Sequence, residues 1–519
     1  MGSAGDAQSS LADATNVADC VRASARRRGG HVALVHGQGD SRQEVTWSRL
    51  DADVDAAAAG FRGSLGLHVG DRVALVLGNT PAFVTAYFGV LRAGLVAVPL
   101  NTGFTSAELS RMLGDSGAKV VVCDDGTAHA VDEAVADTHR AVVDLAGLDS
   151  VIAAGRDGAA LTGPTAAGEV LAVLLFTSGT SGRPRGAMLS HRALLANLRQ
   201  CLALDPAPVL PDDVVLLVLP LFHVYGLNSG LGLVAATGAR AVLAERFEPR
   251  ETLALVRAEG VTNIPGAPPM YVAWTALDDE LDAVDVGAAL RGVRLMASGA
   301  APLSPAVLEQ VLTRTGVAIH EGYGLTETSP VVTSTVATPR VKPGSVGRPL
   351  PGVEVRLVDE RGATVDEDDA GEIEVRGDNL FSGYWPDGAG GPDAEGWWPT
   401  GDVAYADDDG DLFLVDRRTD LVLVSGFNVY PREVEDALAE HPHVAEVAVI
   451  GVPHPRTGEA VKAYVVARPG TSLTPEVVTT FAASRLARFK RPTIVVLVAE
   501  LPHSATGKVA KGQLREPAP

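Results

Sequence analysis

Residues 177–186 read Thr-Ser-Gly-Thr-Ser-Gly-Arg-Pro-Arg-Gly and combine three glycines with four hydroxyl side chains. They follow the apolar segment 171–176 and precede a helix that we expect to begin near His191. A glycine-rich loop in this position can surround polyphosphate oxygens with N–H and O–H donors, and Arg183 and Arg185 add positive charge. It is not a Walker A loop, because no Gly-Lys-Ser/Thr follows at the required spacing. The segment therefore predicts a phosphate-binding loop, and a solvated linker is the alternative.

Residues 321–328 read Glu-Gly-Tyr-Gly-Leu-Thr-Glu-Thr. Two glycines flank Tyr323, and residues that lack a Cβ let the backbone lie close to a flat ring. Thr326 offers a hydroxyl group, and Glu327 offers the hard carboxylate oxygens that Mg²⁺ prefers. This segment predicts a contact with a ring and a metal ion, and a strand end with a helix cap is the alternative.

Two turns later in the chain carry charged residues that could contact the same kind of ligand. The Thr-Gly-Asp turn that ends at Asp402 places a carboxylate where it can accept hydrogen bonds from both hydroxyls of a ribose, and Arg417 can bind the same sugar. The Gly-Lys pair that ends at Lys508 places an ammonium group on a turn near the C-terminus. Taken alone, both patterns are also typical of ordinary surface turns.

Alternating strand-like and helix-like segments must position the first two motifs. Helices are expected at 81–93 and 107–113, and strands are expected at 72–77, 95–98, 119–123, 171–176, 214–219, 261–264, 293–296 and 317–319. This alternation predicts parallel sheets flanked by helices, with ligand loops at the carboxyl ends of the strands.

The pattern changes after residue 344. Short alternating strands with Gly, Pro and Asp turns predict a small β subdomain at about 344–417. A last module follows over 418–519, with helices near 431–439 and 475–486 and strands near 444–450 and 460–466. This module carries a small excess of basic residues, whereas residues 1–417 are strongly acidic. We therefore expect an N-terminal domain over 1–417 and a C-terminal domain over 418–519.

The overall composition excludes several classes of protein. The 519 residues include 46% hydrophobic and 21% charged side chains with a net charge of −21, which argues against a nucleic-acid or anionic membrane partner. No apolar run approaches the roughly 20 residues of a membrane span, and the first residues do not resemble a signal peptide. The three cysteines, Cys20, Cys123 and Cys201, form no C-x-x-C pair, which fits a reducing, cytoplasmic compartment.

In their order and spacing, the four motifs resemble the adenylate-forming superfamily of acyl-CoA synthetases, peptide-synthetase adenylation domains and beetle luciferases. The resemblance extends over about residues 50–515 and is most like a bacterial fatty acyl-CoA synthetase; further matching segments are 220–226, 297–303, 425–431 and 489–492. It implies an α/β fold with a large N-terminal domain of two α/β sheet subdomains plus a small β-barrel-like subdomain. It also implies a small, mobile α+β C-terminal domain that carries the catalytic lysine.

The resemblance implies how ATP and Mg²⁺ would be held. The β- and γ-phosphates would be bound by Thr177, Ser178, Gly179, Thr180, Ser181, Gly182 and Arg185. The adenine would lie in a slot formed by Gly299, Ala300, Ala301 and Tyr323, with the Tyr323 ring stacked on the base. Glu321, Gly322 and Gly324 would also be cofactor-binding residues. Thr326 would contact the α-phosphate, Glu327 would bind Mg²⁺, and Asp402 and Arg417 would hold the ribose.

The same resemblance implies the catalytic roles. Lys508 would reach the α-phosphate and the attacking carboxylate, and His223 would lie at the mouth of the acyl pocket. Because two anions must meet, catalysis would depend on placed cations and hydrogen-bond donors. After rotation of the C-terminal domain, the loop around Gly426 would build a tunnel for the thiol of coenzyme A.

Two positions depart from the family pattern. Arg185 stands where the family usually has lysine, which keeps the charge but changes its geometry and hydration. Thr419 stands where the hinge residue is usually lysine or aspartate, and the neighbouring Asp420 is a candidate replacement.

The predicted function is Mg·ATP-dependent conversion of a carboxylic acid to its acyl-adenylate, followed by thioester formation with coenzyme A. The alternatives are an acyl-AMP ligase that loads a carrier protein, an amino-acid adenylation domain and a catalytically silent nucleotide-binding protein. No carboxylate near His223 could anchor a substrate ammonium, which disfavours the amino-acid alternative. The candidate pocket segments 222–230, 264–274, 297–301, 321–324 and 331–333 are largely apolar. They favour a medium or long fatty acid, followed by an aromatic or cyclic carboxylate.

Overall fold

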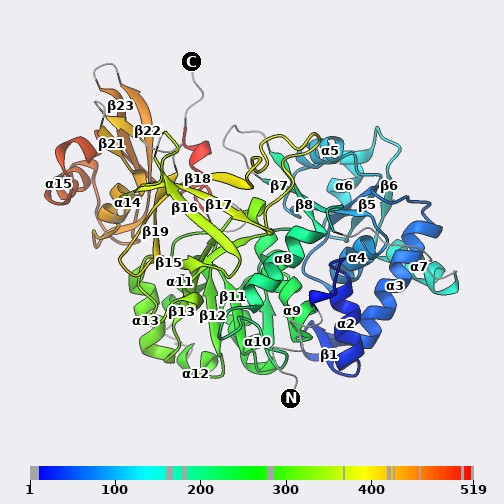
Figure 1. The fold of residues 1–519 in the computed structure, drawn as a ribbon. Helices are drawn as coiled ribbons and strands as arrows, with labels where there is room; N and C mark the ends of the chain where they lie inside the picture. Colours follow the sequence, from blue (N-terminus) through cyan, green and yellow to red (C-terminus); the bar gives the residue numbers. More distant parts are fainter. Residues whose placement is uncertain are drawn as a thin grey trace. The chain divides into compact units, whose positions relative to one another are not determined.

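The computed structural model describes residues 11–158, 168–177, 184–277, 286–359, 361–365, 369–417, 422–424, 427–454, 457–503 and 508–515. These residues form two compact units (Figure 1). The first unit contains the described residues up to 354 together with 376–398, and the second contains those of 355–375 and 399–515.

A six-stranded sheet in the first unit carries the phosphate-loop motif. Its order is β6 (Ala141–Val143), β5 (Val120–Cys123), β3 (Arg72–Val76), β4 (Val96–Pro99), β7 (Leu171–Thr177) and β8 (Arg185–Ser190). The pairs from β6 to β7 are parallel, and β7 pairs antiparallel with β8. Strands β3, β4 and β5 are almost entirely buried and rich in valine, as expected for parallel strands covered on both faces.

Helices accompany this sheet. They are α2 (Asp19–Arg28), α3 (Trp47–Gly63), α4 (Pro81–Arg92), α5 (Ser106–Ser116), α6 (Ala128–Val135), α7 (Leu145–Asp157) and α8 (His191–Leu202). Five of them, α3, α4, α5, α7 and α8, begin after a residue whose side chain accepts a hydrogen bond from a first-turn N–H group. The Thr80 hydroxyl accepts the Phe83 N–H ahead of α4, and Thr105 and Glu108 form a capping box on α5.

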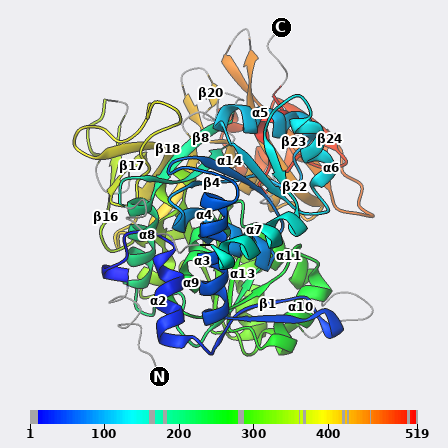
Figure 2. The same ribbon diagram turned by 90° about the vertical axis from the view of Figure 1, so that its right-hand side faces the viewer.

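Glycines let three of these helices lie unusually close together. A Cβ added at Gly155 of α7 would lie 1.9 Å from the carbonyl oxygen of Ala56 in α3, and one added at Gly60 of α3 would lie 2.1 Å from the carbonyl oxygen of Val151. Gly89 of α4 meets α3 in the same way, because its Cβ would lie 2.7 Å from Ala57 Cβ. Figure 2 shows α3, α4 and α7 side by side on this part of the molecule.

The second sheet carries the ring and metal motif. The strands that it contains in the first unit follow the order β15 (Ser345–Pro349), β14 (Val331–Ser334), β13 (Ile319–Gly324), β12 (Leu295–Ser298), β11 (Asn263–Gly266), β9 (Val214–Leu217), β10 (Arg240–Leu243), β1 (Val32–His36) and β2 (Gln43–Thr46). The strands from β13 to β1 are parallel, and β14, β15 and β2 run antiparallel to their neighbours. A large core that includes Trp274, Tyr271 and Ile264 lies against it.

The helical segments that accompany the second sheet complete the first unit. They are the π-helical segment η2 (Tyr225–Gly232), α9 (Leu233–Thr237), α10 (Pro249–Glu259), α11 (Pro268–Leu277), α12 (Val286–Leu290) and α13 (Pro305–Thr315). The two α/β sheets with flanking helices confirm the predicted fold class of the large N-terminal part.

The later strands correct one expectation, because they do not form the predicted β-barrel-like subdomain. β16 (Val353–Val358), β17 (Gly371–Gly377), β18 (Trp397–Ala406) and β19 (Leu412–Arg417) follow one another in an open order. Within the described part of the chain β16 and β19 do not pair, so the four strands close no barrel, and small barrels have about five strands or more.

The C-terminal part has its own sheet and core. Its strands are β20 (Val422–Val424), β21 (Phe427–Val429), β22 (Val444–His454), β23 (Gly458–Ala467) and β24 (Ile494–Val498), with helices α14 (Pro431–Ala439) and α15 (Pro475–Arg485). Val434, Leu438 and Val478 pack from these helices onto the sheet. The second unit also takes in residues before 418, and the domain boundary at 417 stays a prediction. Among the described helices, none has both the length and the apolar character needed to cross a membrane.

Candidate active site

The carboxyl ends of two neighbouring strands bring the predicted adenine-slot residues together. Ser298 at the end of β12 is in register with Glu321 of β13, so residues 299–301 and residues 322–324 each follow directly from this pair. The Tyr323 side chain is 8% exposed, and Ala300 has a left-handed backbone with φ of 69°. A non-glycine residue in this conformation costs about 1–2 kcal/mol. The chain therefore accepts local strain where these strands end.

Close backbone approaches explain the glycines of the same motif. A Cβ at Gly324 would lie 1.9 Å from the carbonyl oxygen of Pro330, and one at Gly322 would lie 3.0 Å from that of Thr333. Glu321 is buried, and its Oε2 accepts the Leu303 N–H at 3.1 Å. Glu321 thus ties the segment after Gly299 to β13.

Glu327 lies on the single turn η3 (Thr326–Thr328) and is 7% exposed. The Tyr384 hydroxyl donates a 2.7 Å hydrogen bond to Glu327 Oε1, and the Phe381 N–H donates to the Glu327 carbonyl at 2.9 Å. Within the described residues, Oε2 makes neither a hydrogen bond nor an ion pair. A buried carboxylate with one oxygen held and the other available fits a hard divalent cation such as Mg²⁺.

Arg185 lies at the start of β8 and is paired with Thr177, the last residue of β7. Its guanidinium carbon lies 3.4 Å from the centroid of the Tyr384 ring. Tyr384 therefore contacts Arg185 through its ring and Glu327 through its hydroxyl. Ser178, Gly179, Thr180, Ser181 and Gly182 lie outside the described residues.

Sequence reasoning missed Tyr384. The segment 382–385 reads Ser-Gly-Tyr-Trp, and a glycine that precedes two aromatic residues was the available signal. That signal is weak, because only the fold brings this segment next to Glu327 and Arg185.

Three buried asparagines hold the backbone that follows Glu327, namely Asn197, Asn228 and Asn379. Their Nδ2 groups donate hydrogen bonds of 2.7, 2.7 and 2.9 Å to the carbonyl oxygens of Val331, Ser329 and Thr328, respectively. Ser329 needs this support, because it has a left-handed φ of 66°. The position of the Glu327 turn is thus fixed from three other segments of the first unit.

The predicted acyl-pocket residue His223 lies two residues before Tyr225, where the π-helical segment begins. Its Nδ1 accepts the Tyr225 N–H at 3.3 Å, and burial lowers the pKa of His223 to about 4, so the ring is neutral near pH 7. The Tyr225 ring packs against Gly299, where an added Cβ would lie 3.0 Å from Tyr225 Cε1. Burial also raises the pKa of the Tyr225 hydroxyl above its ordinary value. Both side chains therefore present neutral surfaces next to the slot residues.

The remaining predicted residues belong to the second unit. Asp402 of β18 and Arg417 of β19 are direct cross-strand partners, and Gly401 before them has a φ of 77°. Lys508 is exposed and precedes Val509, which bridges antiparallel to His503. Gly426, Thr419 and Asp420 lie outside the described residues.

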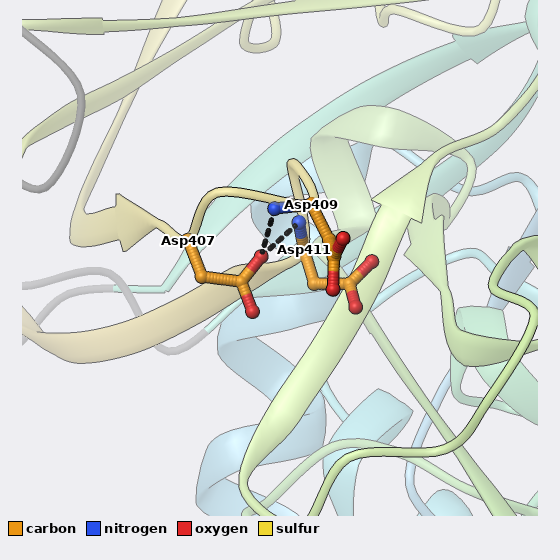
Figure 3. Close-up of side chains that lie close together, drawn as sticks. All are labelled: Asp407, Asp409 and Asp411. Atoms are coloured by element: carbon orange, nitrogen blue, oxygen red, sulfur yellow. Dashed lines mark hydrogen bonds between the residues drawn. The ribbon is translucent and has the colours of Figure 1, made fainter.

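Three aspartates meet on the hairpin between β18 and β19, namely Asp407, Asp409 and Asp411 (Figure 3). Asp407 accepts the backbone N–H groups of Asp409 and Asp411 through one carboxylate oxygen, at 3.1 and 3.0 Å. This geometry is that of an Asx turn, so we assign the group to the structure of the hairpin.

Comparison with known proteins identifies the family. Residues 21–385 match the model of AMP-binding enzymes, and residues 433–508 match the model of the AMP-binding enzyme C-terminal domain. The chain belongs to the AMP-binding enzyme family. The first match contains Arg185, Glu327 and Tyr384, and the second ends at Lys508. The resemblance to the adenylate-forming superfamily is thereby confirmed.

Relatives within the AMP-binding family match almost the whole chain. A long-chain-fatty-acid–CoA ligase from Yersinia pestis is 36% identical over 513 residues, which cover 91% of this chain and 90% of the relative. A feruloyl-CoA synthase from Amycolatopsis is 35% identical over 484 residues, which cover 91% and 93%. Among solved structures, ATP-bound MatB from Rhodopseudomonas palustris has a TM-score of 0.85 at 33% identity and covers 96% of this chain and 98% of its own.

Proposed function

We propose that this protein activates a medium- or long-chain fatty acid and transfers it to coenzyme A. The protein is an ATP-dependent, AMP-forming acid–thiol ligase, as expected for its family. Its long-chain-fatty-acid–CoA ligase relatives, from Yersinia pestis and from Bacillus subtilis among others, support the fatty acid as the substrate. Within the site, the main observation in support of ATP-dependent activation is the buried Glu327 carboxylate, which accepts a hydrogen bond from Tyr384 next to Arg185.

The first step joins the substrate carboxylate to the α-phosphorus of ATP and releases pyrophosphate. Both reactants are anions, so the barrier is lowered by charges that are already in place. Arg185 supplies a fixed guanidinium beside the phosphate loop, and Glu327 would hold Mg²⁺, which neutralises phosphate charge when it is bound. Tyr323 would stack on the adenine, Asp402 and Arg417 would hold the ribose, and Thr326 would donate to the α-phosphate.

Lys508 and Gly426 would serve the two half-reactions in turn. In the first, the Lys508 ammonium would stabilise charge on the α-phosphate and orient the carboxylate. In the second, the thiol of coenzyme A attacks the acyl carbonyl carbon, the bond to the AMP oxygen breaks, and AMP leaves. We propose that the C-terminal domain rotates between the two steps and brings the loop around Gly426 to the thiol.

The acyl substrate follows from the residues around the predicted pocket. In the segments 222–230, 264–274, 297–301, 321–324 and 331–333 the only charged side chain is Glu321. Glu321 accepts the Leu303 N–H, and none of these segments offers a cation for a second carboxylate. With His223 and Tyr225 neutral, this lining suits a monocarboxylate with an apolar tail. The feruloyl-CoA synthase relative supports an aromatic acid as the second candidate.

A panel of carboxylates tests the proposal. Pyrophosphate release and AMP formation are measured with octanoate, palmitate, benzoate and a hydroxycinnamate, with and without coenzyme A. We expect the highest kcat/KM for a fatty acid and multiple turnovers only with coenzyme A. A higher kcat/KM for an aromatic acid would establish the second candidate. Transfer to a carrier protein but not to coenzyme A would establish an acyl-AMP ligase.

We place the protein in the cytoplasm. The three cysteines are free and buried, and burial raises the pKa of the Cys20 and Cys201 thiols to about 12 and that of Cys123 to about 11. Such thiols are packing residues with little thiolate character near pH 7, which fits a chain that needs no disulfide.

A further inference from the structure

We propose that Tyr384 is a positioning residue that separates Arg185 from Glu327 and aims the Glu327 carboxylate at the metal ion. This inference rests on the proposed role of Glu327 in holding Mg²⁺. It assigns a function to a tyrosine that belongs to neither the phosphate loop nor the metal motif.

The backbone fixes Tyr384 between the two charged groups. On one side, the Trp385 N–H donates to the Gly186 carbonyl at 2.8 Å, and the Met188 N–H donates to the Gly383 carbonyl at 3.1 Å. On the other side, the Phe381 N–H donates to the Glu327 carbonyl at 2.9 Å. Hydrogen bonds on both flanks of Tyr384 therefore set its distance from Arg185 and from Glu327.

Gly390 borders the stacked pair on one side. Its φ is 70°, and an added Cβ would lie 3.1 Å from Arg185 Nη2 and 3.2 Å from Tyr384 Cδ2. The Trp398 indole N–H donates to the Gly390 carbonyl at 2.9 Å and holds this backbone in place. Phe381 meets the Tyr384 ring edge-on with centroids 4.9 Å apart. The phenol thus has little freedom to leave the stack.

The ring keeps two opposite charges from neutralising each other. Across the described residues Arg185 and Glu327 form no ion pair, and the Tyr384 phenol contacts both. A direct ion pair would occupy the donors needed for phosphate and the oxygens needed for a cation. With the ring between them, the guanidinium N–H groups can meet phosphate, and only one Glu327 oxygen is occupied.

This arrangement also accounts for arginine at position 185. A planar guanidinium stacks on an aromatic face, whereas the ammonium of lysine is a compact and strongly hydrated charge. A cation above the ring withdraws electron density from the phenol, which makes its O–H a stronger donor to the carboxylate. Arginine in place of the usual lysine at position 185 therefore suits a residue that stacks on Tyr384.

The test compares Tyr384→Phe, which removes the hydroxyl and keeps the ring, with Tyr384→Leu, which removes both. Tyr405→Phe is the control, because Tyr405 is a partly exposed tyrosine that stacks on Phe413 in the second unit. Binding of Mn²⁺ in the presence of a non-hydrolysable ATP analogue is followed by electron paramagnetic resonance, and analogue binding without metal is measured separately.

For Tyr384→Phe we expect Mn²⁺ binding to weaken by about tenfold or more, from the loss of one hydrogen bond to a charged group, with metal-free analogue binding within twofold of wild type. For Tyr384→Leu we expect both Mn²⁺ binding and metal-free analogue binding to weaken, because Arg185 can then form an ion pair with Glu327. Tyr405→Phe should match wild type in both measurements.

Wild-type Mn²⁺ binding by Tyr384→Phe, with binding lost in Glu327→Gln, would overturn the role of Tyr384 and leave that of Glu327 intact. Wild-type Mn²⁺ binding by Glu327→Gln would overturn the metal assignment itself and this inference with it. Equal loss of metal and analogue binding in Tyr384→Phe would indicate a merely structural residue and also count against the inference.

Discussion

Glu327 and Lys508 occupy opposite kinds of environment. Glu327 is buried and hydrogen-bonded through Tyr384, whereas Lys508 is exposed on the second unit next to the bridge between His503 and Val509. A buried carboxylate needs hydrogen-bond partners in fixed positions, because a charge without such partners in the protein interior costs free energy. An exposed ammonium is stable in water and can be delivered when it is needed. The two environments thus suit the roles proposed for these residues, a fixed charge for Glu327 and a charge delivered during the reaction for Lys508.

Replacing Lys508 with alanine should remove adenylation and leave thioester formation largely intact. Loss of one such cation lowers the rate of the first step by about 10²–10³. Pyrophosphate release is measured for the first step, and conversion of preformed acyl-AMP by coenzyme A for the second. Lys511→Ala is the control, because Lys511 is a neighbouring cation paired with Glu435 at 2.7 Å, and it should change either rate only severalfold. Equal loss of both half-reactions in Lys508→Ala would contradict the assigned role.

Residue types and spacing predicted most of the residues proposed for the candidate site, and their roles stay predictions. The glycine-rich loop, the segment around Tyr323 and the Asp402 turn each have a local pattern that points to a ligand. The structure pairs Ser298, which precedes residues 299–301, with Glu321, and it pairs Asp402 with Arg417. Tyr384 could not be predicted, since its hydrogen bond to Glu327 spans 57 residues of sequence and depends wholly on tertiary structure.

At the scale of elements, helix signals gave the most reliable boundaries. The helix expected at 81–93 is observed as Pro81–Arg92, and that expected at 431–439 as Pro431–Ala439, both with proline in the first turn. The π-helical segment Tyr225–Gly232 was not predicted, because its backbone follows from Asn228 donating to Leu194 and Ser329 rather than from a local pattern. The barrel-like form was implied by the family resemblance and was wrong, and the alternation along strands could not correct it because alternation does not specify which strands become partners.

The asparagine contacts behind the Glu327 turn should contribute strongly to stability. Asn228→Ala would leave the carbonyl oxygens of Leu194 and Ser329 buried without these donors, which we expect to cost about 3 kcal/mol. Denaturant unfolding measures this loss, and kcat for adenylation should fall as the turn loosens. The control Asn101→Ala removes only an acceptor for the Gly103 N–H at an exposed turn and should cost about 0.5 kcal/mol or less. Equal effects of the two variants would contradict this account.

The start of α8 should make stability depend on pH. His191 is buried, its Nδ1 accepts the Val17 N–H at 3.2 Å, and burial lowers the pKa of His191 to about 4. The unfolded chain has a histidine pKa of about 6.5, so it binds a proton before the folded state does. The stabilisation is therefore present above pH 6.5 and is lost as the pH falls from 6.5 toward 4.

Between pH 7 and 5 this residue alone should lower the free energy of unfolding by about 2 kcal/mol. Denaturant unfolding at both pH values measures the difference. His191→Gln should reduce the pH dependence by that amount, whereas the exposed His139→Gln should leave it unchanged. An undiminished pH dependence in His191→Gln would assign the proton uptake to other groups.

At the scale of the whole molecule, the proposed chemistry is divided between two compact units. Arg185, Tyr323, Glu327 and Tyr384 belong to the first unit, and Asp402, Arg417 and Lys508 belong to the second. Neither unit contains all the predicted contacts to ATP. The sequence predicted a β subdomain from the change of pattern after residue 344 and a C-terminal domain from the change in charge near residue 418, and these bounds stay predictions. It could not specify the compact units themselves, because these depend on contacts between distant segments.

Replacing Gly426 with tryptophan should produce the opposite pattern to Lys508→Ala. A bulky side chain in the predicted thiol tunnel would slow conversion of preformed acyl-AMP and leave pyrophosphate release near the wild-type rate in a single turnover. The same two assays measure both steps. Loss of adenylation in Lys508→Ala together with loss of thioester formation in Gly426→Trp would support a rotating C-terminal domain. Loss of the same step in both variants would refute it.

The glycines that join α3, α4 and α7 have a consequence for experiments that rank positions by tolerance to replacement. At Gly155, even alanine would place a methyl group 1.9 Å from a carbonyl oxygen, so the helices must separate. A saturation library scored by survival on a fatty acid should therefore show a band of intolerant positions at Gly60, Gly89 and Gly155. In cells, variants at these positions should be depleted through degradation. The folded molecules that can be purified should keep normal catalytic constants. In such a library, sensitivity alone would not locate the reaction centre.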